Sequence, residues 1–270
     1  MRIDLHLHST ASDGTLSPED LVGRARAAGL DLIALADHDT VAGVEPAREA
    51  SGDHPTVVPA IEISATHRGR DLHVLGYFID PASDAVTEYA DAAERARSER
   101  MREMIRRLRE HDVPVEYDAV LDEAGADAGT LARPHLARVL WAGGHVDSVS
   151  EAFDRFIGDE GPAYVPLELV DVAGAIHRIH RAGGIAVWAH PPLPLLGGAL
   201  REFVDAGLDG MEVFRPRAAP PDVHRLLNKA RQHDLIVTGG SDWHGDWHGE
   251  LGSFHVAPDQ VARFLERGGL

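Results

Sequence analysis

The sequence predicts an α/β fold in which strands alternate with helices around a barrel, interrupted by one helical insertion. Short apolar runs of strand character recur along the chain, and segments of helical length separate them. Polar residues of metal-binding types follow several of these runs. From about residue 83 to residue 160 the strand runs stop and charged helical segments replace them. We therefore expect residues 1–82 and 161–270 to form the barrel, and residues 83–160 a small helical subdomain.

The first part of the expected barrel contains four strands and two helices. A buried parallel strand is a continuous apolar run with polar residues only at its end, and the run before Asp37 has this form. Ser17 suits a helix N-cap and Pro18 the first helical position. We expect strands at residues 2–9, 32–36, 57–64 and 70–79, and helices at 17–29 and 44–50.

The expected insertion begins with a long helix over residues 84–110, rich in arginine and glutamate. Shorter helices are expected at 116–124, 133–142 and 148–157. The arginines of the long helix alternate with acids, which predicts a solvated face with intrahelical ion pairs. These arginines are Arg95, Arg97, Arg100, Arg102, Arg106, Arg107 and Arg109.

Strand and helix alternation then resumes. Gly183 and Gly184 are a typical stop signal for the helix that precedes them. Strands are expected at residues 185–189, 210–214 and 235–240. Helices are expected at residues 170–182, 200–206, 221–233 and 258–268.

Composition excludes several classes of protein. The formal net charge is −18, and Lys229 is the only lysine. Stable binding of duplex DNA requires a basic surface, so we do not expect it. The chain has no cysteine, which excludes disulfides and thiolate ligands. No apolar run is long enough to span a bilayer and no signal peptide is visible, so we expect a cytoplasmic protein without membrane contact.

Residue types that bind metals are concentrated at the ends of the expected strands. His6 and His8 are two residues apart on one strand, so both imidazoles project from the same face. Glu62 lies among apolar residues, where a carboxylate must be paired, hydrogen-bonded or bound to a metal. The carboxyl ends of barrel strands converge on one face, where barrel enzymes carry their chemistry. The nine candidate ligands are His6, His8, Asp13, His38, Glu62, His73, His190, Asp242 and His244.

Imidazole and carboxylate ligands without sulfur suit manganese, iron or zinc. We expect Mn²⁺, with Fe²⁺, Zn²⁺ and Mg²⁺ as alternatives. Asp37 and Asp39 flank His38 and could orient imidazoles by hydrogen bonds, although Asp39 could equally cap the next helix.

The motifs identify the chain as similar to the PHP (polymerase and histidinol phosphatase) family, within the amidohydrolase-like barrels. The matching segments are HLHS at 6–9, ASDGT at 11–15, LADHDT at 35–40, IEIS at 61–64, HVLGYF at 73–78, ARPH at 132–135, AHP at 189–191 and GGSDWHG at 239–245. The resemblance implies a distorted (β/α)7 barrel with an inserted helical subdomain and a centre of three divalent ions. By this resemblance one ion would take His6, His8, Glu62 and Asp242, a second Glu62, His73 and His190, and a third Asp13, His38 and His244.

The resemblance also implies a phosphoesterase. A hydroxide generated at the ions would attack a phosphate held among the catalytic residues His6, His8, Glu62, His190 and Asp242. The ARPH element resembles the branch that hydrolyses nucleoside 3′,5′-bisphosphates, such as adenosine 3′,5′-bisphosphate, and can remove nucleotides from the 5′ ends of short RNA or DNA. In that branch Arg133 and His135 would hold a substrate phosphate, although their place at a helix start fits an ordinary cap with a surface arginine equally well. Ser64 is a further candidate contact. Arg215, beside a strand end, could bind a phosphate or lie in a solvated loop.

Other functions stay open. Histidinol-phosphate phosphatase uses the same metal motifs, although the ARPH element and the position of the insertion argue against it. A polymerase-associated proofreading exonuclease would need a polymerase domain. A non-enzymatic metal-binding barrel would be expected to lack ligands, whereas all nine positions are filled. The acidic Asp159–Gly161 stretch argues more strongly against a long RNA than against a mononucleotide, and the sequence leaves the oligomeric state open.

Overall fold

The computed structural model describes residues 1–125 and 129–270. Within these residues seven strands form one sheet, and each strand that the sequence predicts is present. Their bounds are β1 Ile3–Leu7, β2 Leu32–Leu35, β3 Thr56–His67, β4 Arg70–Tyr77, β5 Ile185–Trp188, β6 Gly210–Phe214 and β7 Ile236–Gly239.

The expected helices are also present, with two changes at helix ends. Residues 153–157 form a π-helical turn after a shortened α6, and Pro258–Gln260 is a 3₁₀ turn before α10. The helices are α1 Pro18–Ala27, α2 Val44–Ser51, α3 Asp84–Glu110, α4 Tyr117–Ala124, α5 Arg133–Ala142, α6 Val149–Ala152, α7 Val172–Arg181, α8 Ala199–Asp205, α9 Pro220–Gln232 and α10 Ala262–Gly268. Further 3₁₀ turns lie at Leu193–Gly197 and Asp246–His248.

The strands follow one another in the sheet in chain order, but they are not all parallel. β4 runs antiparallel to both β3 and β5, while the other neighbouring strands are parallel. β3 and β4 form a hairpin because Arg68 and Gly69, both at positive φ, provide the two-residue turn that such a connection requires. The sequence prediction of alternating barrel strands was therefore wrong at β4.

The sheet does not close, so the distorted barrel expected from the sequence is not confirmed. In the part of the chain that the structure describes, β1 and β7 share no ladder, and isolated contacts link the end of β1 to the segment that follows β7. One is the amide of His8, which donates to the carbonyl of Trp243 at 3.0 Å. The chain turns away after the short β7, where Asp242 adopts a φ of 54°. This turn ends strand pairing and brings the segment after β7 beside the end of β1.

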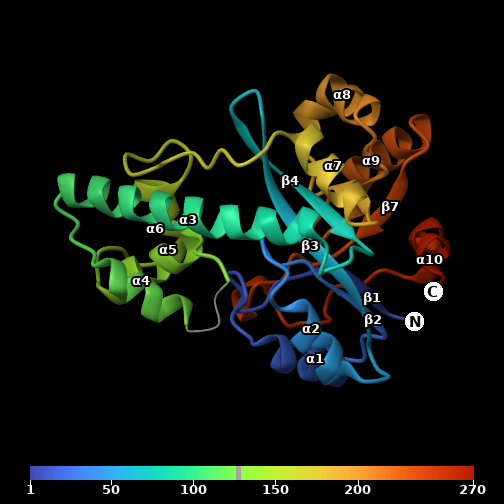
Figure 1. The fold of residues 1–270 in the computed structure, drawn as a ribbon, viewed down its shortest axis with the longest axis horizontal. Coiled ribbons are helices and arrows are strands. Elements are labelled where there is room, and N and C mark those ends of the chain that lie inside the picture. Colours follow the sequence, from blue (N-terminus) through green and yellow to red (C-terminus); the bar gives the residue numbers. More distant parts are fainter. Residues whose placement is uncertain (126–128) are drawn as a thin grey trace.

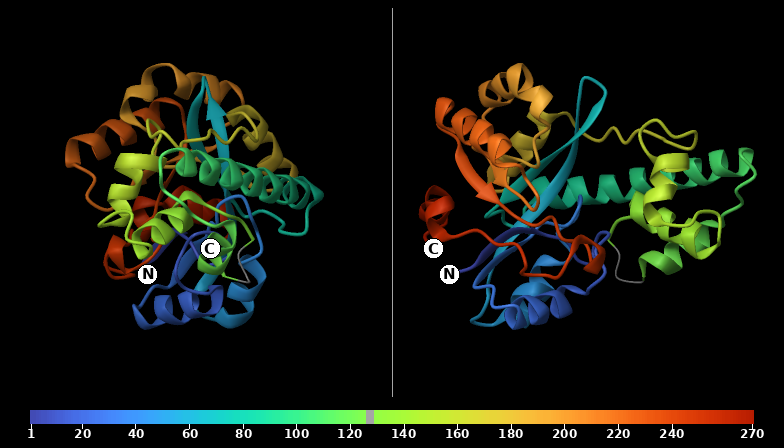
Figure 2. Two further views of the ribbon diagram at one scale, coloured as in Figure 1. Left: turned by 90° about the vertical axis from the view of Figure 1, so that its left-hand side faces the viewer. Right: turned by 180° about the vertical axis from the view of Figure 1, so that it is seen from behind.

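Helices cover the sheet from several sides (Figure 1). α7, α8 and α9 pack with one face of β3 to β6 in the largest core cluster. α1 and α2 pack beside β1 and β2 in a second cluster. The opposite face of the sheet forms its own core, to which α10 contributes Phe264 and Leu265. Both chain termini lie at the same end of the molecule as α10 (Figures 1 and 2).

The helical region, residues 84–157 of the described chain, projects away from the sheet (Figure 2). α3 connects the two parts, because Val86 and Tyr89 pack in the core of the sheet while Met101 and Met104 pack among the other helices. These helices bury a separate hydrophobic cluster that includes Leu136 and Leu140. No helix in residues 1–125 or 129–270 is long and apolar enough to cross a membrane.

Candidate metal centre and substrate cavity

The nine predicted ligands lie together at the end of the sheet that faces the helical region. β1 carries His6, and His8 follows it directly, while His38 follows β2. His190 follows β5 at a φ of 29°, and Asp242 follows β7, also at positive φ. Positive φ is uncommon for residues with a side chain, and such conformations concentrate at functional sites. Residues more than 230 positions apart in the chain therefore meet, as the strand-end pattern predicted.

Glu62 lies at the middle of this group and is fully buried. Its Oε2 lies 3.4 Å from Nε2 of both His6 and His8. Asp242 approaches the same two rings, with its Oδ1 at 3.2 Å from Nε2 of His8. Donor atoms of these four side chains all lie within 4.8 Å of one another, which suits a single ion.

The second carboxylate oxygen of Glu62 faces two further imidazoles. Glu62 Oε1 lies 3.0 Å from Nδ1 of His73 and 2.9 Å from Nε2 of His190. His73 lies early in β4, opposite Ser64 of β3. Because β4 runs antiparallel, its first residues are at the same edge as the carboxyl end of β3. His38 Nδ1 lies 2.9 Å from the other oxygen of Glu62, Oε2. His38 can therefore belong to this group as well as to the next.

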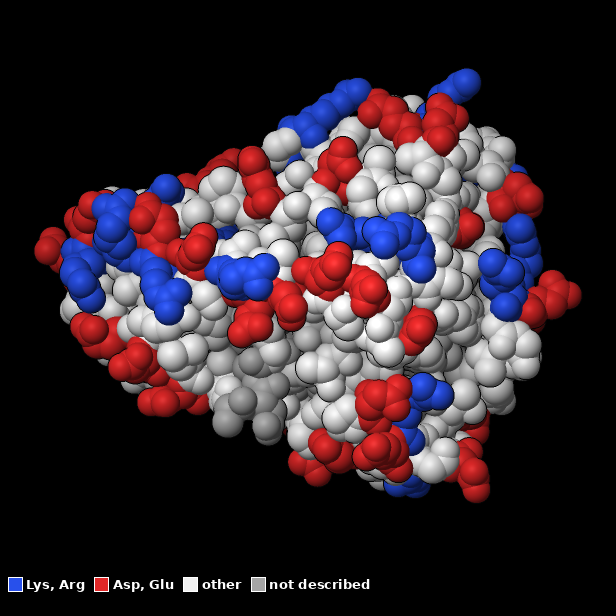
Figure 3. Space-filling view, viewed as in Figure 1, with Lys and Arg blue, Asp and Glu red and all other residues white. Residues whose placement is uncertain are grey.

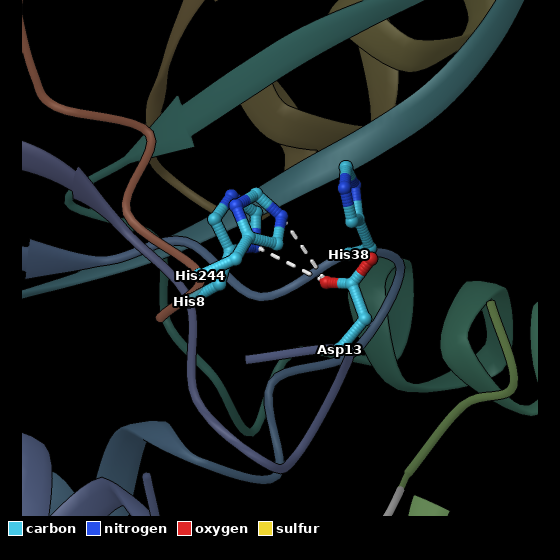
Figure 4. A group of neighbouring side chains, drawn as sticks. All are labelled: His8, Asp13, His38 and His244. Carbon is cyan, nitrogen blue, oxygen red and sulfur yellow. Dashed lines mark ion pairs between the residues drawn. The ribbon is translucent and has the colours of Figure 1, made fainter. Parts of the chain in front are cut away.

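A third group surrounds Asp13 and is drawn in Figure 4. Asp13 Oδ1 lies 3.2 Å from Nε2 of His244 and 4.0 Å from Nδ1 of His8. The rings of His8 and His244 stack with centroids 3.9 Å apart. His38 completes a set whose donor atoms again lie within 4.8 Å of one another. The three groups share members, as a cluster of neighbouring ions would require.

The donor atoms of these groups fit bound ions. Among the described residues, several of these buried atoms make no hydrogen bond although they lie beside other polar groups. They are His6 Nε2, His8 Nδ1 and Nε2, Asp13 Oδ1, His38 Nδ1 and Glu62 Oε2. A buried polar atom without a partner costs about 1–3 kcal/mol, and these atoms face one another only as ion pairs, so a cation bound among them would satisfy several donor atoms at once. Nitrogen and oxygen donors crowded at these distances suit divalent cations.

The electrostatics of the site agree with this fit. Burial alone would raise the pKa of Glu62, but the imidazoles around it, led by His38, hold that pKa well below its usual range. Burial and the nearby His244 lower the pKa of His8 to about 3. Burial would lower the pKa of His244, yet Asp13 raises it to about 9. Without ions, protons on some imidazoles therefore balance the buried carboxylates, and divalent ions would replace those protons.

Glu212 is a member of the site that sequence reasoning missed. It is fully buried in β6, and its Oε1 lies 3.0 Å from Nδ1 of His6. Its Oε2 accepts the amide N–H of His190 at 2.8 Å. Glu212 therefore fixes the orientation of the His6 ring, as carboxylate partners of metal-binding histidines do. An acid inside the apolar run Gly210–Phe214 was the available signal, and it is the same argument that identified Glu62.

Asp37 and Asp39 do not have the orienting role that was expected of them. Asp37 accepts the amide and hydroxyl of Ser9 and the hydroxyl of Ser12, and thereby shapes the loop before Asp13. In the described chain neither carboxylate hydrogen-bonds an imidazole.

Asp39 does not cap α2 either. It accepts the amide N–H of Ser64 at 2.6 Å and Nε of Arg97 at 2.7 Å. Arg97 also donates to the Ser64 hydroxyl at 2.9 Å. This buried network links α3 of the helical region to the strand that carries Glu62.

A cavity of about 780 Å³ lies between the ligand cluster and the helical region. Its walls include Asp13, His38, His73 and His244 from the cluster. Two of the four predicted substrate contacts, Ser64 and Arg133, also line it. The volume is typical of a small-molecule site.

The other two predicted substrate contacts do not line this cavity. His135 is only 1% exposed, and its Nδ1 accepts the amide N–H of Ala132. Its position three residues after the N-cap explains this role, because a side chain there can reach back to the N-cap amide. Arg215 follows β6 directly and is partly buried. Neither residue is among those that line the cavity.

Four arginines line the cavity, namely Arg97, Arg100, Arg133 and Arg138. Arg97 and Arg100 belong to α3, so the expectation that the arginines of α3 form only a solvated face was wrong for two of them. Burial together with Arg133 and Arg97 lowers the pKa of Arg100 to about 10. Its Nη2 is buried and makes no hydrogen bond within the described residues. Converging cations with an unused donor favour an anionic ligand.

Comparisons with known proteins agree with this geometry. The model of the PHP domain matches residues 4–106. The chain is 36% identical to a 5′-3′ exoribonuclease of Haemophilus influenzae, with 90% of each chain covered. It is 32% identical to a 3′,5′-nucleoside bisphosphate phosphatase of Chromobacterium violaceum, covering 92% of this chain and 88% of that protein.

A solved structure gives the same result. A protein of Bifidobacterium adolescentis, described as a candidate metal-dependent phosphoesterase, superposes with a TM-score of 0.89 at 35% identity, covering 98% of this chain and 96% of that one. The clustered ligands, the adjoining cavity lined by arginines and these likenesses lead to one assignment: the chain belongs to the PHP family of metal-dependent phosphoesterases.

Proposed function

We propose that the protein hydrolyses a phosphate ester of nucleoside 3′,5′-bisphosphates, such as adenosine 3′,5′-bisphosphate, at a centre of three divalent ions. The observation that carries the proposal is the shared cavity, which both the ligand cluster and four arginines line. A substrate with two phosphates has one group for each of these environments. The relative from C. violaceum, named for this activity, supports the proposal.

Mn²⁺ is the ion that we expect, with Fe²⁺, Zn²⁺ and Mg²⁺ as alternatives. One ion would be held by His6, His8, Glu62 and Asp242, a second by Glu62, His73 and His190, and a third by Asp13, His38 and His244. Such ions, when bound, supply a water of lowered pKa and neutralise charge on the reacting phosphate. The chain itself fixes the ligands: Glu212 orients His6, and Asp37 holds the loop that carries Asp13.

The arginines would bind the phosphate that does not react. Arg100 offers its buried Nη2, and Arg133 is partly exposed to the cavity. Asp159 pairs with Arg133 at 2.7 Å. A substrate phosphate would compete with this exposed carboxylate for the guanidinium. We propose that the helical region, residues 83–160, is a substrate-binding subdomain inserted between barrel segments 1–82 and 161–270, because it supplies these arginines.

A second candidate is removal of nucleotides from the 5′ ends of short oligonucleotides. The relative from H. influenzae, a 5′-3′ exoribonuclease, favours it. The face in Figure 3 favours small substrates instead, since basic and acidic side chains are interspersed over it and offer little to a long polyanion. We therefore propose mononucleotides, rather than oligonucleotides, as the preferred substrates.

The test is kcat/KM with Mn²⁺ for adenosine 3′,5′-bisphosphate, a short 5′-phosphorylated RNA and histidinol phosphate, measured side by side. The bisphosphate should exceed the others by orders of magnitude, and chelation should remove the activity until Mn²⁺ is restored. Comparable turnover of RNA would favour the exonuclease. Turnover of histidinol phosphate alone, or turnover that resists chelation, would contradict the proposal.

A further inference from the structure

Two tryptophans in the substrate cavity have exposed side chains. Among the described residues, the large hydrophobic side chains with high exposure are Met1, Leu121, Trp141, Trp247 and Leu270. Only the two tryptophans line the cavity, and each is 54% exposed. Burying an indole is strongly favourable, so two exposed indoles in one cavity indicate a ligand with a flat apolar surface.

Neighbouring residues hold Trp247 in place. A Cβ at Gly245 would clash with the indole of Trp247, so glycine at this position allows the ring to lie against the backbone. The guanidinium of Arg138 lies 5.9 Å from the centroid of the Trp247 ring. Glu123 fixes Arg138 through an ion pair of 2.6 Å. The ring is therefore held before any ligand arrives, which lowers the entropic cost of binding.

Trp141 reaches the same cavity from the helical region. It lies on α5, three residues after Arg138, so the two side chains are neighbours on one face of the helix. Trp247 follows His244 by only three residues. The two indoles thus come from the two parts of the protein, and one is linked through a short loop to a predicted metal ligand.

We propose that Trp141 and Trp247 bind the nucleobase of the substrate by stacking. This inference rests on the proposed function and extends it, because it assigns the part of the cavity that recognises the base. Stacking uses the π-face that every base has, so we expect purine and pyrimidine nucleotides to be accepted alike. The phosphates would occupy the ligand cluster and the arginines, and the base would lie over the tryptophans.

The first experiment compares adenosine 3′,5′-bisphosphate with ribose 3,5-bisphosphate, which lacks the base, in the Mn²⁺-loaded enzyme. Trp141→Ala and Trp247→Ala should each raise KM for the nucleotide relative to KM for the ribose compound, by roughly 5- to 150-fold. Trp141→Phe and Trp247→Phe should restore most of the difference. Leu121→Ala, an exposed hydrophobic residue outside the cavity, should leave the ratio unchanged. Equal effects on both substrates would overturn the proposal.

The second experiment needs no turnover. The other tryptophans, Trp188 and Trp243, are buried, so a stacked base should quench fluorescence mainly from Trp141 and Trp247. In chelated enzyme, adenosine 3′,5′-bisphosphate should quench this emission and ribose 3,5-bisphosphate should not. Loss of the quenching in the Trp141→Phe, Trp247→Phe double variant supports stacking. Equal quenching by both compounds, or none by either, refutes it. An enzyme that shows base-dependent quenching but never hydrolyses the bisphosphate would refute the proposed function and leave the stacking site intact.

Discussion

Replacing His135 by glutamine tests whether this residue caps a helix or binds substrate. Burial lowers the pKa of His135 to about 4, from an ordinary value near 6.5. The unfolded chain therefore binds a proton at a higher pH than the folded chain. The stability that follows from this difference is complete above pH 6.5 and is lost as the pH falls toward 4. Between pH 7.5 and pH 5 the loss amounts to about 2 kcal/mol.

His135→Gln should remove this pH dependence. Glutamine is neutral at all pH values and can still accept the Ala132 amide from the same helical position. Urea unfolding at pH 7.5 and pH 5 should show wild type losing about 2 kcal/mol more than the variant. Equal losses would refute the reasoning about the buried ring. If His135→Gln greatly raised KM for the bisphosphate while wild type and variant lost equal stability, His135 would be assigned to substrate binding.

Three further predictions concern the metal centre and the cavity. His6→Ala combined with His8→Ala should abolish turnover and lower the content of bound metal while circular dichroism stays unchanged; full activity would exclude the site. Glu212→Gln should weaken metal affinity by about 10- to 100-fold, measured by competition with a chelator, and an unchanged affinity would show that the His6 contact is incidental. Arg133→Ala should raise KM for the bisphosphate by about 10-fold or more but hardly change KM for an aryl phosphate, because only the bisphosphate has a second phosphate that loses a charged contact. Arg225→Ala, on the exposed face of α9, is the matched control. Equal effects of Arg133→Ala on both substrates would contradict the assigned role.

Sequence patterns were sufficient to predict the strands and helices and to bring the nine candidate ligands together, because both predictions need only the position of each residue within its own strand or helix. A parallel strand places its end residues at a known edge, so His6, His38 and Asp242 could be brought together without coordinates. The apolar run of β4 resembles that of a parallel strand and does not reveal its direction. The signal lay in the connection, because the five residues between the expected strands at 57–64 and 70–79 are too few for a parallel crossover, and the pairing of β4 with β3 and β5 is antiparallel.

The arginines of α3 show a different limit of prediction from sequence. Arg97 repeats the spacing of the buried stripe of α3, between Ala93 and Met101, and this periodicity could have separated it from its solvated neighbours. Arg100 has no such signal, because its environment depends on how α3 lies over the segment that carries Val165. His135 shows a related limit, since a motif gives the residue type but does not decide between a phosphate contact and a helix cap, and the structure shows the contact with the Ala132 amide.

The distribution of charge is compatible with the proposed binding of a multiply charged anion by an acidic protein. The net charge of −18 is spread over the surface, where at physiological ionic strength its influence falls off within about 8 Å. The charges of Arg97, Arg100 and Arg133 are instead concentrated around one cavity, where partial burial reduces screening. Outside the ligand cluster, four arginines and two acids, Asp71 and Asp147, line the cavity, so a mononucleotide bound there as proposed would meet more positive than negative side chains. The distal nucleotides of a longer strand would extend over the acidic exterior, so each added phosphate would gain little. This arrangement favours small substrates by charge as well as by shape.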